Sequence, residues 1–176
     1  MRKVLFILSE LLDEDVEWLA TEGERMACAA GFELIALGSR VESVFFVLGG
    51  TFTVYSPGGD KIVDLGSGEI IGEMSLVDPA RTTASVRAAD ECVVLRLPNQ
   101  MLREKLAVDL GFAARFYRAL AVFLADRMRN TTRRLGYGAS GPDPKKPQLD
   151  EINEELLDKV YLAGARFDRL LKRLAG

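Results

Sequence analysis

The sequence predicts an α+β fold in which helices flank a small antiparallel barrel or jelly roll. Three observations predict it. Short apolar runs with strand character recur between Gly31 and Leu97, turns rich in glycine, serine and proline separate them, and the residues on either side change to helical spacing. At 176 residues, with 48% hydrophobic and 28% charged residues, the chain has room for one domain with a substantial core and a C-terminal extension.

The N-terminal flank predicts a short helix over residues 12–22. Asp13 is expected to cap it, Glu14 and Asp15 give it an acidic first turn, and Val16 and Leu19 form its apolar face. The strand-like runs follow, and they read FELIAL (32–37), SVFFVL (43–48), TFTVY (51–55), KIVDL (61–65), ASVRA (84–88) and CVVLRL (92–97).

The C-terminal flank predicts two helices joined by a linker. Apolar residues at helical spacing indicate a long helix over 112–135, and the glycine and proline residues of 136–148 are typical of a linker. Residues 149–174 form a strongly amphipathic pattern, which suits either packing on the chain's own barrel or a two-stranded dimer seam. We therefore expect a domain over 1–135, a linker over 136–148 and a C-terminal helical segment over 149–176.

Composition narrows the function. The chain has no histidine, which excludes serine–histidine nucleophile pairs, histidine acid–base chemistry and histidine-containing zinc sites, so we expect neither an enzyme nor a metal or cofactor. The net charge of −3 gives no overall field that would recruit DNA or an anionic membrane. Cys28 and Cys92 lie in apolar stretches, as buried reduced thiols do, and no apolar run is long enough to span a membrane, so a cytoplasmic location is expected.

One segment, IIGEMSLVDPARTTASV (70–86), interrupts the strand pattern. Glycines near its start permit close backbone approach, and residues 73–77 can form one helical turn that ends before Pro79. The N–H groups of that turn, the Arg81 guanidinium and nearby hydroxyl groups are suited to an anion. Glu73 would repel an anion but accepts well from a sugar hydroxyl, so the segment predicts a site for a phosphorylated sugar.

Gly31 to Val86 resembles the cyclic nucleotide-binding domain family, which includes the catabolite activator protein and the regulatory subunits of cyclic-AMP-dependent kinase. LIALGSRVESVFFVLGG (34–50) and IGEMSLVDPARTTASV (71–86) carry the resemblance, and the second of these is similar to the family's phosphate-binding cassette. The resemblance implies an eight-stranded antiparallel β-roll, or jelly roll, with an N-terminal helix, a short helix inside the cassette and C-terminal helices.

The resemblance also implies roles for individual residues. Glu73 would accept from the ribose 2′-hydroxyl, and Thr83 would contact a phosphate oxygen or a guanine amino group. The family's phosphate-binding arginine would fall on Thr82, with Arg81 one position early. The ligand-binding set implied in this way is Gly72, Glu73, Met74, Ser75, Arg81, Thr82 and Thr83.

A second, shorter match lies in DRMRNTTRRL (126–135). It resembles the end of the dimer helix of the catabolite activator protein, where two adjacent hydroxyl residues contact the base, one of them from the partner subunit. In this chain they are Thr131 and Thr132. The match implies a homodimer formed through residues 112–135, to which residues 149–174 can add.

Together these features predict a cyclic-nucleotide sensor that binds cyclic AMP or cyclic GMP as a regulatory ligand and signals to a protein effector. It stands alone without a helix-turn-helix, since only one helix follows the linker, so neither DNA nor a membrane is an expected partner. The alternative is a degenerate cassette that binds a cyclic dinucleotide or no nucleotide and acts as a protein-interaction module. An enzyme would need paired carboxylates, for which Glu69 and Glu73 are the obvious pair.

Overall fold

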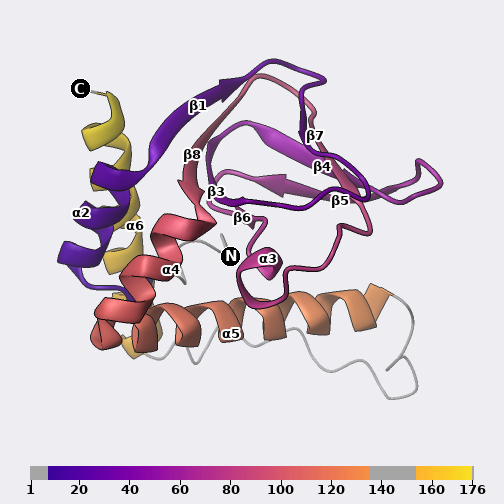
Figure 1. Ribbon diagram of the computed structural model, residues 1–176. Coiled ribbons are helices and arrows are strands. Elements are labelled where there is room, and N and C mark those ends of the chain that lie inside the picture. The colour runs from indigo at the N-terminus through magenta and orange to yellow at the C-terminus, as the bar shows by residue number, and fades with distance from the viewer. Residues whose placement is uncertain (1–7, 135–153, 176) are drawn as a thin grey trace.

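The computed structural model describes residues 8–134 and 154–175, and within them eight strands form the predicted antiparallel β-roll (Figure 1). One sheet has the order β1 (Glu24–Cys28), β8 (Cys92–Pro98), β3 (Ser43–Gly49) and β6 (Ile70–Ile71). The other has the order β2 (Glu33–Ile35), β7 (Ser85–Ala88), β4 (Thr51–Tyr55) and β5 (Lys61–Gly66). Each expected run contains a strand, whereas β1 and β6 lie outside those runs.

Strand β3 divides the apolar residues between two cores. Because side chains alternate along a strand, Phe45 and Val47 point between the two sheets while Val44 and Phe46 point to the helices outside the roll. All four are buried because both faces of the strand are covered. Cys28 and Cys92 pair in register across β1 and β8 as free, buried thiols, and burial raises the pKa of both.

Three helices follow the roll in the described ranges. The first, α4 (Asn99–Val108), was not predicted as a separate helix, and the predicted long helix is α5 (Leu110–Arg134). Asp109 separates them, since its carboxylate accepts the Phe112 N–H (2.8 Å) and pairs with Lys105 (2.8 Å). Helix α5 runs beneath the roll, with the short helix α3 (Met74–Val77) between them (Figure 1).

The N-terminal helix α2 (Asp13–Glu22) begins differently from the prediction. Asp13 does not cap it, because its carboxylate is bound instead by Arg166 (2.7 Å) and Arg169 (2.8 Å), which lower its pKa. Leu12 is the N-cap residue, and its N–H donates to the Asp15 carboxylate (2.7 Å), which also pairs with Arg115 of α5 (2.8 Å). Asp15 therefore joins α2 to α5.

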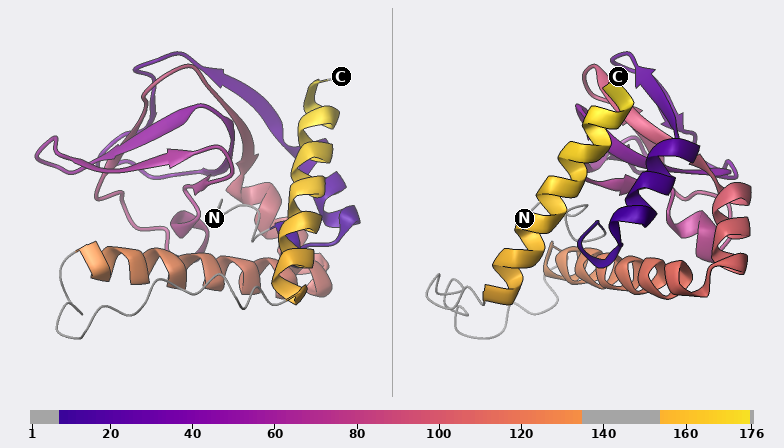
Figure 2. Two further views of the ribbon diagram at one scale, coloured as in Figure 1. Left: turned by 180° about the vertical axis from the view of Figure 1, so that it is seen from behind. Right: turned by 90° about the vertical axis from the view of Figure 1, so that its left-hand side faces the viewer.

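The last helix, α6 (Glu154–Ala175), lies beside α2 of the same chain (Figure 2). Ala163, Phe167 and Leu170 are buried in the apolar core between the roll and the helices, which we call the outer core. The buried Arg166 donates to the Leu8 carbonyl (2.9 Å) as well as to Asp13. Of the two arrangements that the sequence left open, the structure shows this helix packed on its own chain. Residues 136–148 and 149–153 lie outside the described residues, so the division at 135 and 148 stays a prediction.

Candidate functional site

The cassette, residues 71–86, begins with a backbone turn that requires glycine. Gly72 has a φ of +83°, and a Cβ added there would lie 2.6 Å from the Ser43 carbonyl oxygen. A side chain would be strained in this conformation and would also collide with β3. The turn carries the chain from β6 into Glu73 and then α3, which ends at Val77 with Asp78 as its C-cap residue, as the proline at 79 predicts.

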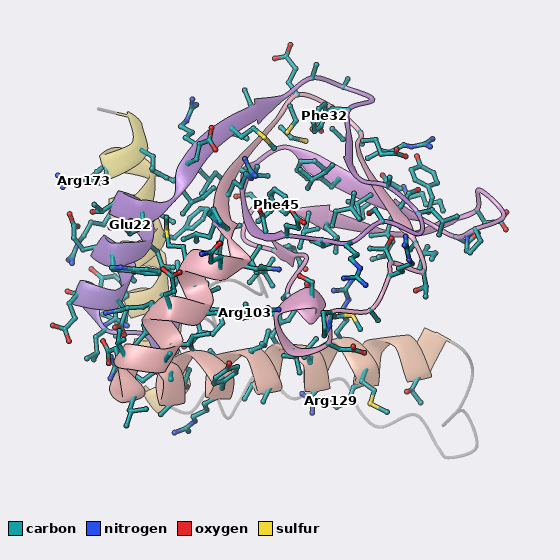
Figure 3. The ribbon with its side chains drawn as sticks, in the orientation of Figure 1. Glu22, Phe32, Phe45, Arg103, Arg129 and Arg173 are labelled. Atoms are coloured by element: carbon teal, nitrogen blue, oxygen red, sulfur yellow. The ribbon has the colours of Figure 1, made fainter. Side chains whose placement is uncertain are left out.

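Ser75 ties the cassette to α4. Its hydroxyl donates to the Gly72 carbonyl (2.6 Å) and accepts from Nδ2 of the buried Asn99 (2.9 Å). Arg103 of α4 donates from Nη2 to the Ser75 carbonyl (3.1 Å), and Figure 3 labels Arg103 on the side of α4 that faces α3. The Ser75 hydroxyl is therefore engaged within the protein.

The side chains of Arg81 and Thr82 both form hydrogen bonds to the loop that follows β2. The Thr82 hydroxyl donates to the Ala36 carbonyl (2.7 Å) and accepts from the Ser39 N–H (3.1 Å), while Arg81 donates from Nη1 to the Gly38 carbonyl (2.9 Å). Side chains of neighbouring residues point to opposite faces only within a strand. Because β7 begins only at Ser85, positions 81 and 82 are not forced to opposite faces. Both line the same pocket.

Arg127 of α5 reaches into the cassette and pairs with Glu73. Its Nη1 lies 2.7 Å from Glu73 Oε1, and the Glu73 side chain is only 3% exposed. Burial raises the pKa of Glu73, and the nearby Arg127 charge offsets part of that effect. Glu73, the residue predicted to bind the ribose, is thus in contact with a cation from the long helix.

Glu73, Arg81, Thr82 and Arg127 line one hollow of about 310 Å³, which we call the cassette pocket. Arg81 and Arg127 bring positive charge to it, while Glu73 brings a buried carboxylate and Asp78 an exposed one. Its remaining wall is largely apolar and includes Ile35, Val54, Leu65, Ile71 and Val86. A small anionic molecule that also carries hydroxyl groups and an apolar or planar part matches this lining.

Most of the predicted site residues meet in this pocket. Its lining includes Gly72, Glu73, Met74, Ser75, Arg81, Thr82 and Thr83. Thr132 is exposed on α5 and donates back to the Met128 carbonyl (2.9 Å), so it does not line the pocket, and the side chain of Thr131 lies outside the described residues. Both stay predictions as base-contacting residues.

Sequence reasoning missed Arg127 as a site residue. Its position, four residues after Phe123 and seven after Leu120, is on the α5 face whose apolar members are buried against the rest of the chain. That spacing could have identified it. In the described ranges no group of three or more metal-ligating side chains comes together, and no helix there has the length and apolarity to span a membrane.

Comparison with known proteins agrees with this geometry. Residues 25–109 match the family model described as cyclic nucleotide-binding domain. The structure of a Thermus thermophilus catabolite activator protein is 22% identical in sequence and has a TM-score of 0.61. The alignment covers 94% of this chain and 84% of that one, and at this identity it supports the fold alone. Residues 25–109 thus form a cyclic nucleotide-binding domain, a class of regulatory signal-transduction domain.

Two relatives are longer than this chain. An NTE family protein of Mycobacterium tuberculosis is 30% identical over 154 residues, which cover 85% of this chain and 26% of the relative. The cAMP-activated global transcriptional regulator Vfr of Pseudomonas aeruginosa is 32% identical over 111 residues, which cover 58% of this chain and 50% of Vfr. The chain therefore spans about a quarter of the first relative and half of the second.

Proposed function

We propose that the cassette pocket binds a cyclic mononucleotide, cyclic AMP or cyclic GMP, and that the chain is a regulatory sensor rather than an enzyme. The observation that carries the proposal is the meeting of Glu73, Arg81, Thr83 and Arg127 around one hollow of about 310 Å³. Cyclic AMP is the first ligand to test, because the relative Vfr is described as cAMP-activated.

The phosphate lies beside Arg81 and Thr83 in this proposal. A guanidinium has five N–H donors, and Arg81 uses one of its nitrogens on Gly38, so donors remain for a phosphate oxygen. The Thr82 hydroxyl already gives its proton to Ala36, whereas Thr83 is exposed at the pocket. Arg81 thus supplies from position 81 the charge that the family's pattern expects at position 82.

The ribose hydroxyl donates to the Glu73 carboxylate. It either binds there alongside the Arg127 guanidinium or displaces it. Because Arg127 belongs to α5, occupancy of the pocket changes the contacts that hold the C-terminal half of this helix beneath the roll. Movement of α5 would then be the signal that a partner chain or a protein effector reads.

Calorimetric titration with cyclic AMP, cyclic GMP and cyclic di-GMP tests the proposal. We expect a mononucleotide to bind, Glu73→Ala to abolish the heat, and Arg81→Gln to weaken binding by about ten- to a hundredfold, the value of a charge-assisted phosphate contact. Arg25→Gln, an exposed arginine on β1, is the matched control and should bind as the wild type does. Absence of binding to both mononucleotides would refute the proposal.

The alternative function keeps the fold and changes the ligand. Thr82 stands where the family has arginine, and the buried Glu73 carboxylate already has a charged partner within the protein in Arg127. A module of this kind would bind a cyclic dinucleotide or a protein partner instead. Heat from cyclic di-GMP alone, or from none of the three nucleotides, would favour it.

A homodimer through α5 is part of the proposal. Ala114, Tyr117, Ala121, Leu124 and Met128 repeat every three or four residues along a face of α5 that is exposed or half-buried, as in a two-helix seam. Ala121→Arg should therefore turn a dimer into a monomer in sedimentation velocity. Ala165→Arg, on the exposed side of α6, should leave the dimer intact; the opposite result would assign the seam to α6.

A further inference from the structure

A second and larger hollow, about 750 Å³, lies beside the cassette. We call it the lateral pocket. It is bounded by residues 40–42, Pro79, the end of β8 and one side of α4 from Asn99 to Ala107, and the two linings share only Val41 and Ser75. It contains neither Glu73 nor Arg81, so the function proposed above does not use it.

Three arginines from different parts of the chain meet in this pocket. They are Arg40 after the 36–39 loop, Arg96 of β8 and Arg103 of α4. Arg96 donates from Nε to the Ser43 hydroxyl (3.1 Å) and from Nη1 to the Glu24 carboxylate (3.4 Å), whereas Arg103 uses one nitrogen on the Ser75 carbonyl (3.1 Å). Arg103 therefore retains more N–H donors for an anion than Arg96 does. Glu42 and Glu104 also line the pocket, so its lining residues carry one net positive charge, and Glu24 outside the lining offsets part of the charge of Arg96.

The start of α4 adds to the attraction for an anion. Pro98, Asn99 and Gln100 line the pocket, and the first N–H groups of a helix lack partners within the helix and carry partial positive charge. The Asn99 N–H donates to the Glu42 carbonyl (2.8 Å), so the N–H groups of the next residues are the ones left for an anion.

Asn99 shows that the pocket wall also has an unmet polar group. The residue is 7% exposed, and its Nδ2 donates to the Val41 carbonyl (3.0 Å) and the Ser75 hydroxyl (2.9 Å). Ser75 gives its own proton to Gly72, so the amide cannot be reversed. Oδ1 is then a buried acceptor with no hydrogen-bond partner in the described part of the chain, which is costly unless a donor reaches it.

We propose that the lateral pocket is a second ligand site, for a small phosphate monoester that also carries hydroxyl groups. The phosphate pairs with Arg40 and Arg103 near the start of α4, and a hydroxyl satisfies Asn99 after a small rearrangement of the wall. Val41, Pro98 and Ala107 supply apolar surface for the body of the molecule. The volume lies in the range of small-molecule sites and exceeds the needs of a bare phosphate.

Inorganic phosphate is the probe, titrated into the ¹⁵N-labelled full chain at constant ionic strength with chloride as the reference. We expect saturable shifts at the backbone amides of Gln100 and Met101 and at the Nε–H of Arg103. Arg40→Gln and Arg103→Gln should each weaken binding about tenfold, the value of one charge-assisted contact. Glu104→Gln should strengthen it, because a repelling carboxylate is removed.

Two controls make the test specific. Arg25→Gln removes an exposed arginine elsewhere, and Arg81→Gln removes the cation of the cassette pocket; both should leave the affinity unchanged. Loss of binding in Arg81→Gln with no effect of Arg40→Gln would overturn the proposal, and so would equal shifts with chloride or no saturable shifts. Arg40 has no hydrogen bond or ion pair to another described residue, so its replacement should not disturb the fold.

Discussion

Arg127 and Glu73, which are 54 positions apart in the chain, form a 2.7 Å ion pair that joins the C-terminal half of the long helix to the cassette. The carboxylate is buried and the guanidinium is partly exposed, with 31% of its side chain accessible. The pair is therefore the direct contact between the candidate ligand site and the helix that would carry its signal.

Removing Arg127 should destabilise the chain by about 1–3 kcal/mol, because a buried carboxylate loses its charged partner. Urea denaturation of Arg127→Ala, with Arg25→Ala as the exposed control, measures this effect. Glu73→Gln and the double variant complete a thermodynamic cycle, in which we expect a favourable coupling energy. A coupling energy of zero would mean that the two residues act independently.

Stability should depend on pH through Glu73. Its pKa is raised by burial above the ordinary value of 4.5, so the native state binds this proton more tightly than the unfolded state. The contribution of Glu73 is thus most favourable at pH 4.5 and below and declines as pH rises through the higher native pKa. The free energy of unfolding of the wild type, minus that of Glu73→Gln, should fall between pH 4.5 and 7.

Asp13 and Asp109 act in a different window of pH. Arg166 and Arg169 lower the pKa of Asp13, and Lys105 lowers that of Asp109, so their contributions are present above 3.8 and are lost as pH falls below it. They do not obscure the Glu73 effect.

The opposite result for Glu73 would be a wild-type minus Glu73→Gln difference in the free energy of unfolding that grows between pH 4.5 and 7. It would show that the Arg127 charge outweighs burial at Glu73.

Gly72 and Gly164 should respond oppositely to alanine. Gly72→Ala places a Cβ 2.6 Å from the Ser43 carbonyl at a φ of +83°, and should cost about 1–3 kcal/mol. Gly164 lies within α6 with open space around the added carbon, so Gly164→Ala should stabilise by about 0.5–1 kcal/mol. Thermal denaturation monitored by circular dichroism compares the two, and destabilisation by Gly164→Ala would contradict the position of α6.

Thr82 should matter for stability through its hydroxyl group. Thr82→Val keeps the shape but loses the bonds to Ala36 and Ser39, at a cost of about 1 kcal/mol, while Thr82→Ser should retain most of the stability. Equal stability of the Val and Ser variants would show that the loop does not depend on the hydroxyl.

The same position tests the proposed function through a gain of affinity. Thr82→Arg restores the family's arginine, and if a cyclic mononucleotide is the ligand its affinity should rise by about tenfold or more. Calorimetry measures the change, with Thr82→Gln as a control of similar length and no charge. No gain over Thr82→Gln would mean that the phosphate does not lie beside this position.

The packing of α6 can be tested at Phe167. This side chain is 8% exposed in the outer core, so Phe167→Ala should cost about 3–5 kcal/mol and increase amide exchange in α2 as well as in α6. Tyr161→Ala, a large residue that is 82% exposed on the same helix, should have little effect. Unchanged exchange in α2 would show that α6 does not pack there in solution.

Local residue pattern accounts for most of the roll. Runs such as SVFFVL (43–48) and CVVLRL (92–97) are strand-forming by composition, and Gly72 followed by Glu73 marked the turn into the cassette helix. Strand β6 has only two residues and β1 contains charged side chains, so neither carries a strong pattern of its own. Both exist because they pair with neighbours, β6 with β3 and β1 with β8.

The sequence by itself determined the fold class, the cassette and the absence of histidine chemistry, because strand periodicity, turn glycines and composition are local properties of a chain. The tertiary structure decided which side chains share the site. Arg127 meets Glu73 only because α5 docks beneath the roll, Arg81 and Thr82 line one pocket because both hold the 36–39 loop, and α6 lies on α2 because Arg166 finds Asp13 153 positions away. Such contacts join distant segments, and their geometry depends on how whole elements pack.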